Sequence, residues 1–589
     1  GIPPRSSTQT HAPPAAGLDP EQRAAAIAPG PLLIVAGPGT GKTRTLTHRL
    51  AHLIEAQGVP PERCLAITFT RRACEELAER LHALIPEAAE RVTVTTFHGL
   101  GWQIIREQHD ALGLRADVRV VDEAERLALL GGLTEGPVGR RHLAELSARK
   151  RANDPDETLR RYDEALRGRG LVDFDDLVAL PVRLLAEQPA LASAYRERWT
   201  HIAVDEYQDV DQLQYRLLRH LAPPDGDLCA IGDPDQAIYG FRGGDVGFFL
   251  RFREDYAGAD TVSLTRNYRS SPVIVGAALQ AVRPESLVPD RRLRACAPDA
   301  AQARIVVAEA PTERGEAEFV AATIDRLLGG CAHLSIDSGR ADGSVQAALS
   351  FADFAVLART DAQLAPLVEA LDRAGIPVQK QSHDRLADRP VIEAIICRLR
   401  EEDAEGPPGD VTPVAVLVRQ VGAALVNGGL VTLSEMDAAV DMLSPLAERR
   451  GSDLGRFLGE LALGAEVDTL DPRADRVSLL TLHAAKGLEF DVVFVVGCED
   501  GLLPMRWAGA GHAQDTAEER RLFFVGMTRA RSRLILCSAR RRLRCGTVAE
   551  TAPSPFLDAI DPTLLERLDV QAPPRPRPRQ PSGDQLQLL

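Results

Sequence analysis

A glycine-rich run near the N-terminal end of the chain carries residue types that bind phosphate. Residues 36–43 read Ala-Gly-Pro-Gly-Thr-Gly-Lys-Thr, after an apolar run at 32–35 that predicts a buried strand and before a helical pattern at 44–50. In this context the glycines let backbone N–H groups converge on phosphates, and the helix N-terminus adds its positive end. We expect Lys42 to hold the β- and γ-phosphates of a nucleotide and the Thr43 hydroxyl to ligate Mg²⁺. The alternative is a chance glycine-rich turn.

A pair of acidic residues supplies the second half of this chemistry. Residues 202–206 read Ile-Ala-Val-Asp-Glu, an apolar run that ends in two carboxylates. Hydrolysis at a P-loop requires one carboxylate beside the metal and one that orients or deprotonates the attacking water. We predict that Asp205 is the metal-side carboxylate and that Glu206 is the general base. The two segments together predict Mg²⁺-dependent ATP hydrolysis.

The composition is that of a globular protein with several domains. Its 589 residues predict about three to four domains, and no apolar run is long enough to cross a bilayer. The nine cysteines form no C-x-x-C pair and no zinc spacing, which fits reduced thiols in the cytoplasm. A net charge of −15 argues against coating nucleic acid through bulk charge, but it is compatible with a local basic channel.

Strand and helix patterns alternate along most of the chain, which predicts an α/β fold with parallel sheets. Two α/β regions are expected, each interrupted by a helical insertion, and both proline-rich ends are expected to be disordered. The predicted parts are 1–17 (disordered), 18–105 and 200–275 (first α/β domain), 106–199 (its helical insertion), 276–399 and 476–570 (second α/β domain), 400–475 (its insertion) and 571–589 (Pro/Arg-rich tail).

Several further segments follow one another in the order of a known helicase family. Residues 205–209 (Asp-Glu-Tyr-Gln-Asp) and 232–243 (Gly-Asp-Pro-Asp-Gln-Ala-Ile-Tyr-Gly-Phe-Arg-Gly) resemble motifs II and III of the UvrD/Rep/PcrA helicases of superfamily 1. The other motifs are the Q motif at 18–22, Ia at 67–70, Ib at 96–99, IV at 264–270, V at 481–490 and VI at 518–530. The resemblance implies two RecA-like domains, 1A and 2A, that form an ATP cleft, with helical insertions called 1B and 2B.

The resemblance also implies roles around ATP. Gln22 would read the adenine edge, Tyr268 would stack on the base, and Gln236 would sense the γ-phosphate. Arg269 and Arg529 would act as arginine fingers, and the alternative for each is a solvated surface charge. The implied catalytic set is Lys42, Asp205, Glu206, Gln236, Arg269 and Arg529. The implied nucleotide-binding set is Gln22, Gly37, Pro38, Gly39, Thr40, Gly41, Lys42, Thr43, Arg44, Tyr268, Arg269 and Glu489, with Arg44 and Glu489 near the base or sugar.

Aromatic and basic residues inside the motifs match positions where the family contacts DNA. Single-strand binding uses aromatic platforms and basic groups along a groove. The candidates are Phe69, Phe97, His98, Tyr239, Phe241, Arg242, Arg359 and His483. The alternative for Phe69 and Phe97 is a place in the core. Two departures alter this surface. Phe241 stands where the family usually has Trp, which leaves a smaller stacking ring. Ala358 and Asp361 stand where the family often has Tyr and Asn, so we expect one stacking platform to be absent and Asp361 to repel a phosphate.

The segment at 400–475 is shorter than the 2B insertion of the family, which contacts duplex DNA and regulates unwinding. We therefore expect ATP-driven translocation on single-stranded DNA, 3′→5′ by resemblance, more than strong unwinding. The expected partners are single-stranded DNA and single-strand/duplex junctions, in the DNA repair or replication restart of a cytoplasmic, nucleoid-associated protein. The alternatives are a translocase that strips proteins or follows RNA with little unwinding, and a non-catalytic DNA-binding scaffold.

The ends of the sequence predict two further associations. Gln585 to Leu589 (Gln-Leu-Gln-Leu-Leu) resemble the Gln-Leu-x-Leu-Phe peptides that dock on the bacterial sliding clamp, and the alternative is a tail that folds back on the protein. An insert at 329–340 resembles a loop of UvrD-like proteins that are fused to a phosphoesterase-type domain. Since the chain also begins at Gly1, we expect it to be part of a larger protein.

Overall fold

The computed structural model divides the chain into two compact units. Unit 1 comprises residues 1–275, 285–299 and 381–471, and unit 2 comprises 276–284, 300–380 and 472–589. The structure describes residues 17–134, 136, 138–297, 304–329, 349–381, 391–392, 394–396, 398–399, 412–428, 433–452, 454, 457–458, 474–506, 512–544 and 547–571.

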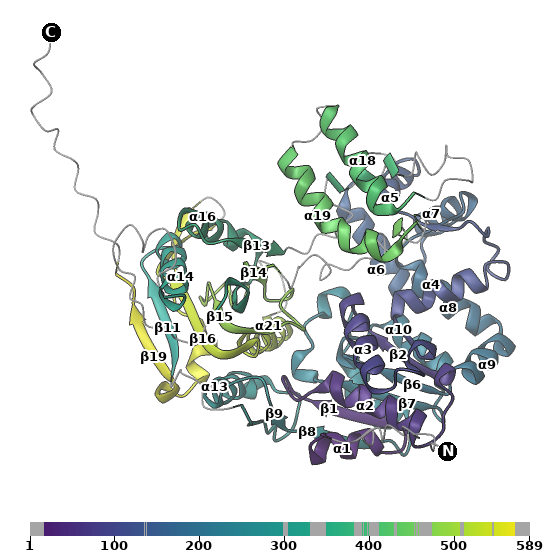
Figure 1. Cartoon of the computed structure of the whole chain (residues 1–589), viewed down its shortest axis with the longest axis horizontal. Helices are drawn as coiled ribbons and strands as arrows, with labels where there is room; N and C mark the ends of the chain where they lie inside the picture. The colour runs from purple at the N-terminus through teal and green to yellow at the C-terminus, as the bar shows by residue number, and fades with distance from the viewer. Residues whose placement is uncertain are drawn as a thin grey trace, which may run out of the picture. The chain divides into compact units, whose positions relative to one another are not determined.

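Unit 1 is built on a six-stranded parallel sheet of order β3-β2-β6-β7-β1-β8 (Figure 1). Its strands are β1 (Leu32–Ala36), β2 (Cys64–Thr68), β3 (Thr93–Thr96), β6 (His201–Val204), β7 (Asp227–Gly232) and β8 (Asp260–Leu264). Its helices include α1 (Pro20–Ile27), α2 (Lys42–Glu55), α3 (Arg71–Leu84), α4 (Phe97–Glu107), α10 (Gln212–Leu221), α11 (Gly247–Leu250) and α12 (Phe252–Asp255).

Alternating side chains of these strands feed two apolar layers. On β1, Leu32 and Ile34 lie in one core cluster with side chains of α1, α2 and α3. Leu33 lies in the other cluster, with side chains of α4 and α10. Helices therefore cover both faces of the parallel sheet, as buried parallel strands require. The carboxyl ends of the strands, where the predicted motifs lie, are left to the connecting loops.

The predicted insertion at 106–199 is mostly helical. It contains β4 (Arg119–Val120), α5 (Glu123–Gly131), α6 (Arg140–Ala152), α7 (Glu157–Gly168), β5 (Leu171–Val172), α8 (Asp176–Glu187) and α9 (Pro189–Arg198). Helices α5, α6 and α7 enclose a small apolar core that includes Leu129, Leu143 and Tyr162. Beside it, the ammonium of Lys150 lies 2.8–3.0 Å from the carboxylates of Asp163, Asp173 and Asp176.

Two shorter pieces complete unit 1. After β9 (Arg266–Asn267) and α13 (Pro272–Val282), the chain returns to unit 1 at 285–299, and β10 (Arg294–Ala295) pairs with β9. The described part of 391–458 holds α18 (Val414–Asn427) and α19 (Leu433–Arg450), drawn in green in Figure 1. These helices share an apolar core that includes Val418, Leu425 and Leu443.

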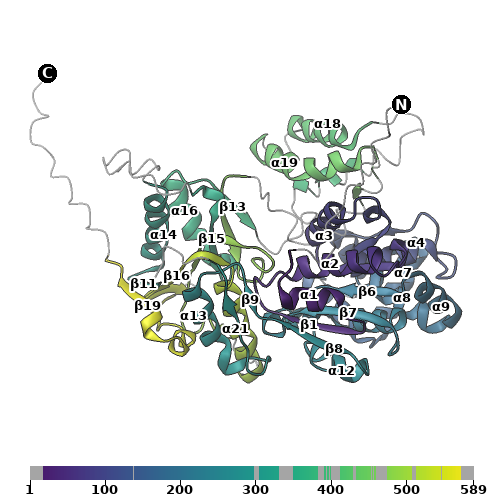
Figure 2. The same cartoon turned by 60° about the horizontal axis from the view of Figure 1, so that its bottom comes forward.

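Unit 2 is built on a seven-stranded sheet of order β13-β14-β12-β15-β16-β11-β19. Neighbours from β14 to β19 in this order run parallel. Helices α14 and α16 lie on one side of the sheet and α21 on the other (Figure 2). The elements are β11 (Ile305–Ala310), α14 (Glu313–Leu327), β12 (Phe354–Ala358), α16 (Ala365–Arg373), β13 (Val378–Gln381), β14 (Val477–Thr481), β15 (Phe490–Val495), α21 (His512–Met527), β16 (Ala530–Ala539), β17 (Arg541–Arg544), β18 (Thr547–Glu550) and β19 (Leu565–Asp569).

The predicted fold class, two parallel α/β domains with helical insertions, is confirmed. The chain first enters unit 2 at residue 276, and it returns to unit 1 for residues 285–299. Within the described ranges, no helix is long and apolar enough to cross a membrane. The predicted clamp peptide at 585–589, the tail after 571 and most of the insert at 329–340 lie outside the described residues.

Candidate active site

The glycine-rich run forms a loop between a buried strand and a helix, as the sequence predicts. It connects β1 to α2, and Lys42 is the first residue of the helix. Gly41 occupies the N-cap position with φ +80°, in the left-handed region, and its backbone leaves the first turn of α2 without a side-chain cap. The N–H groups of that turn, together with the positive end of a 14-residue helix, form a site for an anion.

Side chains from other motifs approach the loop so closely that its glycines have no room for a Cβ. A Cβ on Gly39 would lie 2.6 Å from the Cβ of Arg269, and one on Gly41 would lie 2.6 Å from Nε2 of Gln22. Gln22 is buried and donates from Nε2 to the carbonyl of Thr40 over 3.0 Å. The structure thus brings two motifs that are far apart in sequence, the Q motif and motif IV, to the P-loop.

The loop is further held by its own backbone and by motif IV. The Thr40 hydroxyl donates to the carbonyl of Gly37 (2.8 Å), and Nδ2 of Asn267 donates to the carbonyl of Pro38 (2.6 Å). Asn267 is not among the predicted site residues. Its signal in the sequence is its position in motif IV, directly before the predicted Tyr268 and Arg269.

The two predicted acidic residues follow β6 and lie beside the P-loop lysine. Nζ of Lys42 lies 2.8 Å from Oε1 of Glu206. Burial raises the pKa of Asp205 to about 7, and the charge of Glu206 adds to this effect more than Lys42 offsets it. Burial alone would lower the pKa of Lys42, but the charges of Glu206 and Asp205 raise it above its ordinary value. The ammonium is therefore held charged by its acidic neighbours, with Glu206 in direct contact.

Motif III places Gln236 next to a buried ion pair. Nε2 of Gln236 donates to Oδ2 of Asp233 (2.7 Å), and Asp233 is fully buried. The guanidinium of Arg291 lies 2.6 Å from the same carboxylate oxygen and 2.7 Å from Asp235. Sequence reasoning missed Arg291 because the run Asp-Arg-Arg-Leu-Arg at 290–294 has the pattern of a solvated charged loop. The available signal was the pair of motif III carboxylates, Asp233 and Asp235, since two neighbouring acidic groups need a cation when they are buried.

Residues predicted to contact the base lie near the start of α1. Tyr268 is 47% exposed, and its hydroxyl donates to Oδ2 of Asp19 over 2.6 Å. The Tyr268 N–H donates to the carbonyl of Gly39, which ties the tyrosine to the P-loop. Arg44, on α2, donates to the carbonyl of Gly17. Tyr268 is thus exposed beside the loop, which a base-stacking role requires.

The remaining nucleotide candidates belong to unit 2. Arg529 is 2% exposed, and its guanidinium donates to the carbonyls of Val525 (2.9 Å) and Leu488 (3.2 Å). Glu489 lies 2.6 Å from the guanidinium of Arg531. In this structure both predicted residues are engaged inside their own unit, and their nucleotide contacts stay predictions.

The DNA candidates of unit 1 fall into two groups. Phe97 is 1% exposed in the apolar core, and the half-buried ring of Phe69 packs edge-on against it at 5.4 Å, as the core alternative expects. By contrast, His98 is partly exposed and stacks on Phe174 at 3.9 Å. The ring of Tyr239 is also partly exposed and lies 5.6 Å from the exposed guanidinium of Arg242. The side chain of Phe241 lies outside the described residues.

The DNA candidates of unit 2 lie close to other polar groups. Arg359 forms a two-pronged ion pair with Glu519, whose oxygens lie 2.7–3.0 Å from its nitrogens. His483, in motif V, is buried. Asp361, which departs from the family pattern, lies 2.8 Å from Nζ of Lys380. A lysine from the neighbouring strand β13 thus offsets the carboxylate that the sequence predicts to repel phosphate.

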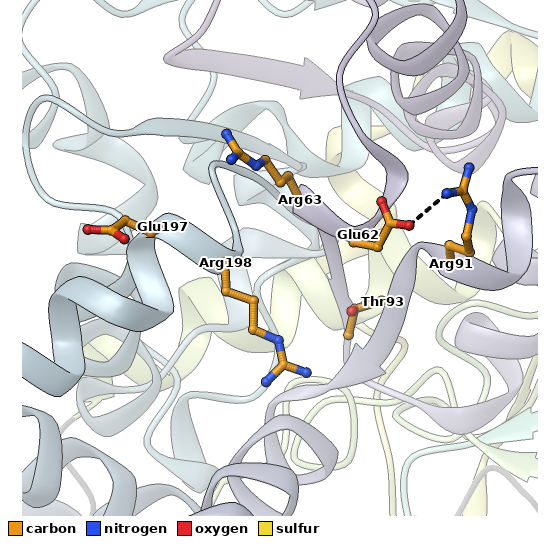
Figure 3. A pocket seen from close by; sticks show the side chains of 6 residues that line it. All are labelled: Glu62, Arg63, Arg91, Thr93, Glu197 and Arg198. Carbon is orange, nitrogen blue, oxygen red and sulfur yellow. Dashed lines mark hydrogen bonds and ion pairs between the residues drawn. The ribbon is translucent and has the colours of Figure 1, made fainter.

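A cavity of about 360 Å³ lies at the opposite edge of the unit 1 sheet, around the starts of β2 and β3. Figure 3 shows Arg63, Arg91 and Arg198 among its lining side chains. Arg91 is paired with Glu62 (2.7 Å), and Arg198 is paired with Glu107 (2.9 Å). Two of the three arginines are thus paired with carboxylates, and Glu62 and Glu197 also line the cavity, so the site is mixed in charge.

Comparison with known proteins identifies the relatives of the chain. Residues 18–153 and 139–257 match the UvrD/REP helicase N-terminal domain, and residues 262–403 and 431–541 match the UvrD-like helicase C-terminal domain. The chain is 30% identical to the ATP-dependent DNA helicase PcrA of Bacillus subtilis, over 94% of this chain and 87% of that protein. It is 32% identical to the ATP-dependent DNA helicase UvrD1 of Mycobacterium tuberculosis, over 93% of this chain and 86% of that protein.

Proposed function

Because the chain belongs to the UvrD/Rep family of helicases, we propose that it is an ATP-dependent DNA helicase that moves 3′→5′ along single-stranded DNA. The observation that carries the proposal is the arrangement around the P-loop. Lys42, Glu206 and Asp205 come from two separate strand ends, and the side chains of Gln22 and Arg269 approach the same loop. These are the groups that nucleotide binding and hydrolysis need.

The residues at this loop fit Mg²⁺ as well as ATP. The Thr43 hydroxyl and the Asp205 carboxylate are hard oxygen donors, which Mg²⁺ prefers. Burial, and after it the charge of Glu206, raises the pKa of Asp205 to about 7, so a bound cation would favour the charged carboxylate. Thr43 and Asp205 would hold the ion, which neutralises phosphate charge when bound.

In the proposed reaction, the N–H groups of the loop and the Lys42 ammonium bind the β- and γ-phosphates. When the Lys42 ammonium changes its partner from Glu206 to the phosphates, the Glu206 carboxylate becomes free to accept the proton of the attacking water. Gln236 contacts the γ-phosphate, and Arg269 and Arg529 neutralise the charge of the transferred group. Tyr268 stacks on the base, where its exposed ring is available.

For DNA, we propose that His98, Tyr239 and Arg242 supply exposed stacking and cationic groups, with Phe69, Phe241, Arg359 and His483 as further candidates. The described part of the 2B-like segment holds α18 and α19, and the family match is interrupted between 403 and 431. This short segment favours translocation, including removal of bound proteins, over strong unwinding. The proposal also includes action at single-strand/duplex junctions in repair or replication restart, and a cytoplasmic, nucleoid-associated location. It further includes docking on a sliding clamp and fusion to another domain.

A comparison of ATP hydrolysis with and without single-stranded DNA tests the enzyme. We expect DNA to stimulate turnover, and Lys42→Ala to abolish it. Duplexes with a 3′ or a 5′ single-stranded tail then test direction and unwinding, because only the 3′-tailed duplex should be opened. Turnover that ignores DNA would contradict the translocase. Opening of only the 5′-tailed duplex would overturn the direction, and stripping of a bound protein without opening either duplex would favour the protein-removing alternative.

A further inference from the structure

Arg291 is placed to organise motif III from a segment outside every predicted motif. Its side chain is 8% exposed, and its two terminal nitrogens lie 2.7 and 2.6 Å from the two oxygens of Asp233. The first nitrogen also lies 2.7 Å from Oδ2 of Asp235. Such a planar, two-pronged contact fixes the orientation of a carboxylate, which a point charge does not.

The carboxylate that Arg291 fixes is a partner of two groups at the proposed reaction centre. Oδ2 of Asp233 accepts both from Arg291 and from Nε2 of Gln236. Asp233 is also near enough for its charge to raise the pKa of Lys42. Burial alone would raise the pKa of Asp233, but Arg291 and Gln236 lower it, so the carboxylate stays charged. The orientation of the Gln236 amide therefore depends on a carboxylate held by Arg291.

The same network reaches the proposed general base through the backbone. The Asp233 N–H donates to Oε1 of Gln208 over 3.0 Å, and Nε2 of Gln208 donates to Oε2 of Glu206. The Gln208 amide thus links the Asp233 backbone to Glu206, and its Nε2 also donates to Oδ2 of Asp209 over 3.1 Å. A displacement of Asp233 would disturb both Gln236 and Glu206.

The segment that carries Arg291 also covers the P-loop. A Cβ on Gly37 would lie 2.6 Å from Cδ2 of Leu293, and β10 pairs with β9 in motif IV. The segment is therefore anchored at the P-loop, at motif III and at motif IV. Such anchoring exceeds what a loop of surface charges needs.

We propose that Arg291 is a positioning residue for ATP hydrolysis, which holds Asp233 and thereby orients Gln236 toward the γ-phosphate. The inference rests on the proposed function, since it assumes that Gln236 senses that phosphate. Arg291 itself acts through Asp233. Its loss should lower turnover more than nucleotide binding.

The test is DNA-stimulated ATPase kinetics of the full chain with Arg291→Ala, Arg291→Lys and Gln236→Ala. We expect Arg291→Ala to lower kcat about tenfold or more, while the KM for ATP changes less than about threefold. Arg291→Lys should fall between, because lysine keeps the charge and loses the two-pronged contact. Arg292→Ala, at the exposed neighbouring position, is the matched control and should behave as wild type.

A double-mutant cycle separates positioning from general stability. If Arg291 acts through Gln236, the variant with both alanines should turn over no more slowly than the slower single variant. Independent effects that multiply, or an unchanged kcat in Arg291→Ala, would overturn the inference. Thermal melting shows whether Arg291→Ala folds, and if it does not, the same cycle with Arg291→Lys decides. An inactive wild type would instead refute the proposed function.

Discussion

Lys42 and Glu206 form a 2.8 Å ion pair between the first residue of α2 and the residue that follows Asp205 at the end of β6. Glu206 adopts φ +51°, a left-handed conformation that is uncommon for a residue with a side chain. The proposed phosphate-binding lysine is thus held by the proposed general base. Nucleotide binding would exchange one anionic partner of Lys42 for another.

This pair predicts different defects for its two members. Glu206→Gln should lower turnover by about 10²-fold or more, since an amide cannot accept the proton, and should retain ATP binding because Thr43 and Asp205 remain. Lys42→Ala should weaken ATP binding as well. Steady-state hydrolysis and the fluorescence of a labelled ATP analogue measure the two effects. Turnover above about a tenth of wild type in Glu206→Gln would refute the assigned base.

The buried charges around Lys150 predict a pH-dependent stability. Burial and the charge of Asp173 raise the pKa of Asp176 from 3.8 to about 7, although Lys150 opposes them. Since the folded state then holds this proton more tightly than the unfolded state, the stabilisation from Asp176 is full below about pH 4 and is lost as the pH rises toward 7. We expect Asp176→Asn to remove the fall in melting temperature over this window.

Asp173 is the matched comparison in the same cluster. Burial would raise its pKa, but Lys150 and Arg126 lower it, so its stabilisation is present above its unfolded pKa and is lost in acid. Asp173→Asn should therefore destabilise the protein at pH 7, by about 3 kcal/mol, because it removes a charged partner of two buried cations. Equal melting curves for Asp173→Asn and Asp176→Asn at pH 7 would contradict these assignments.

In unit 2, a buried arginine predicts a large loss of stability. Arg542 is 4% exposed on β17, and its guanidinium is bound to the carboxylates of Glu316 and Glu499, which are also buried. Arg542→Met should cost about 3–5 kcal/mol in the free energy of unfolding, since it leaves two buried carboxylates without their cation. Arg541→Met, at the exposed neighbouring position, should change little. Denaturant unfolding measures both variants. Equal unfolding midpoints for Arg542→Met and Arg541→Met would contradict the prediction.

Neighbouring aromatic residues of motif Ib should have separable effects. Phe97→Ala should destabilise the protein by about 3–5 kcal/mol, because it empties a fully buried site in the core. His98→Ala should leave the melting temperature nearly unchanged and weaken binding of a labelled single-stranded oligonucleotide, since base stacking contributes about 1–3 kcal/mol per base. Normal DNA affinity in His98→Ala would remove it from the proposed DNA site.

The order of residue types along the chain was enough to predict those parts of the site that depend on sequence neighbours. An apolar strand, a glycine-rich loop and a helix must place Lys42 and Thr43 at a helix N-terminus. An apolar strand that ends in two carboxylates places Asp205 and Glu206 at the same edge of the sheet, because parallel strands share a direction. The parallel α/β fold follows from the same alternation of strands and helices.

Which side chains from distant segments meet could be seen only in the folded molecule. By sequence, Arg291 has the pattern of a surface charge. In the structure it pairs with two buried carboxylates of motif III. Arg542 and Glu316 are likewise paired by the packing of β17 and α14. Phe97 could face DNA or the core by sequence, and the helix start after β3 turns it inward. Such contacts depend on packing between elements, which local patterns of residue type do not specify.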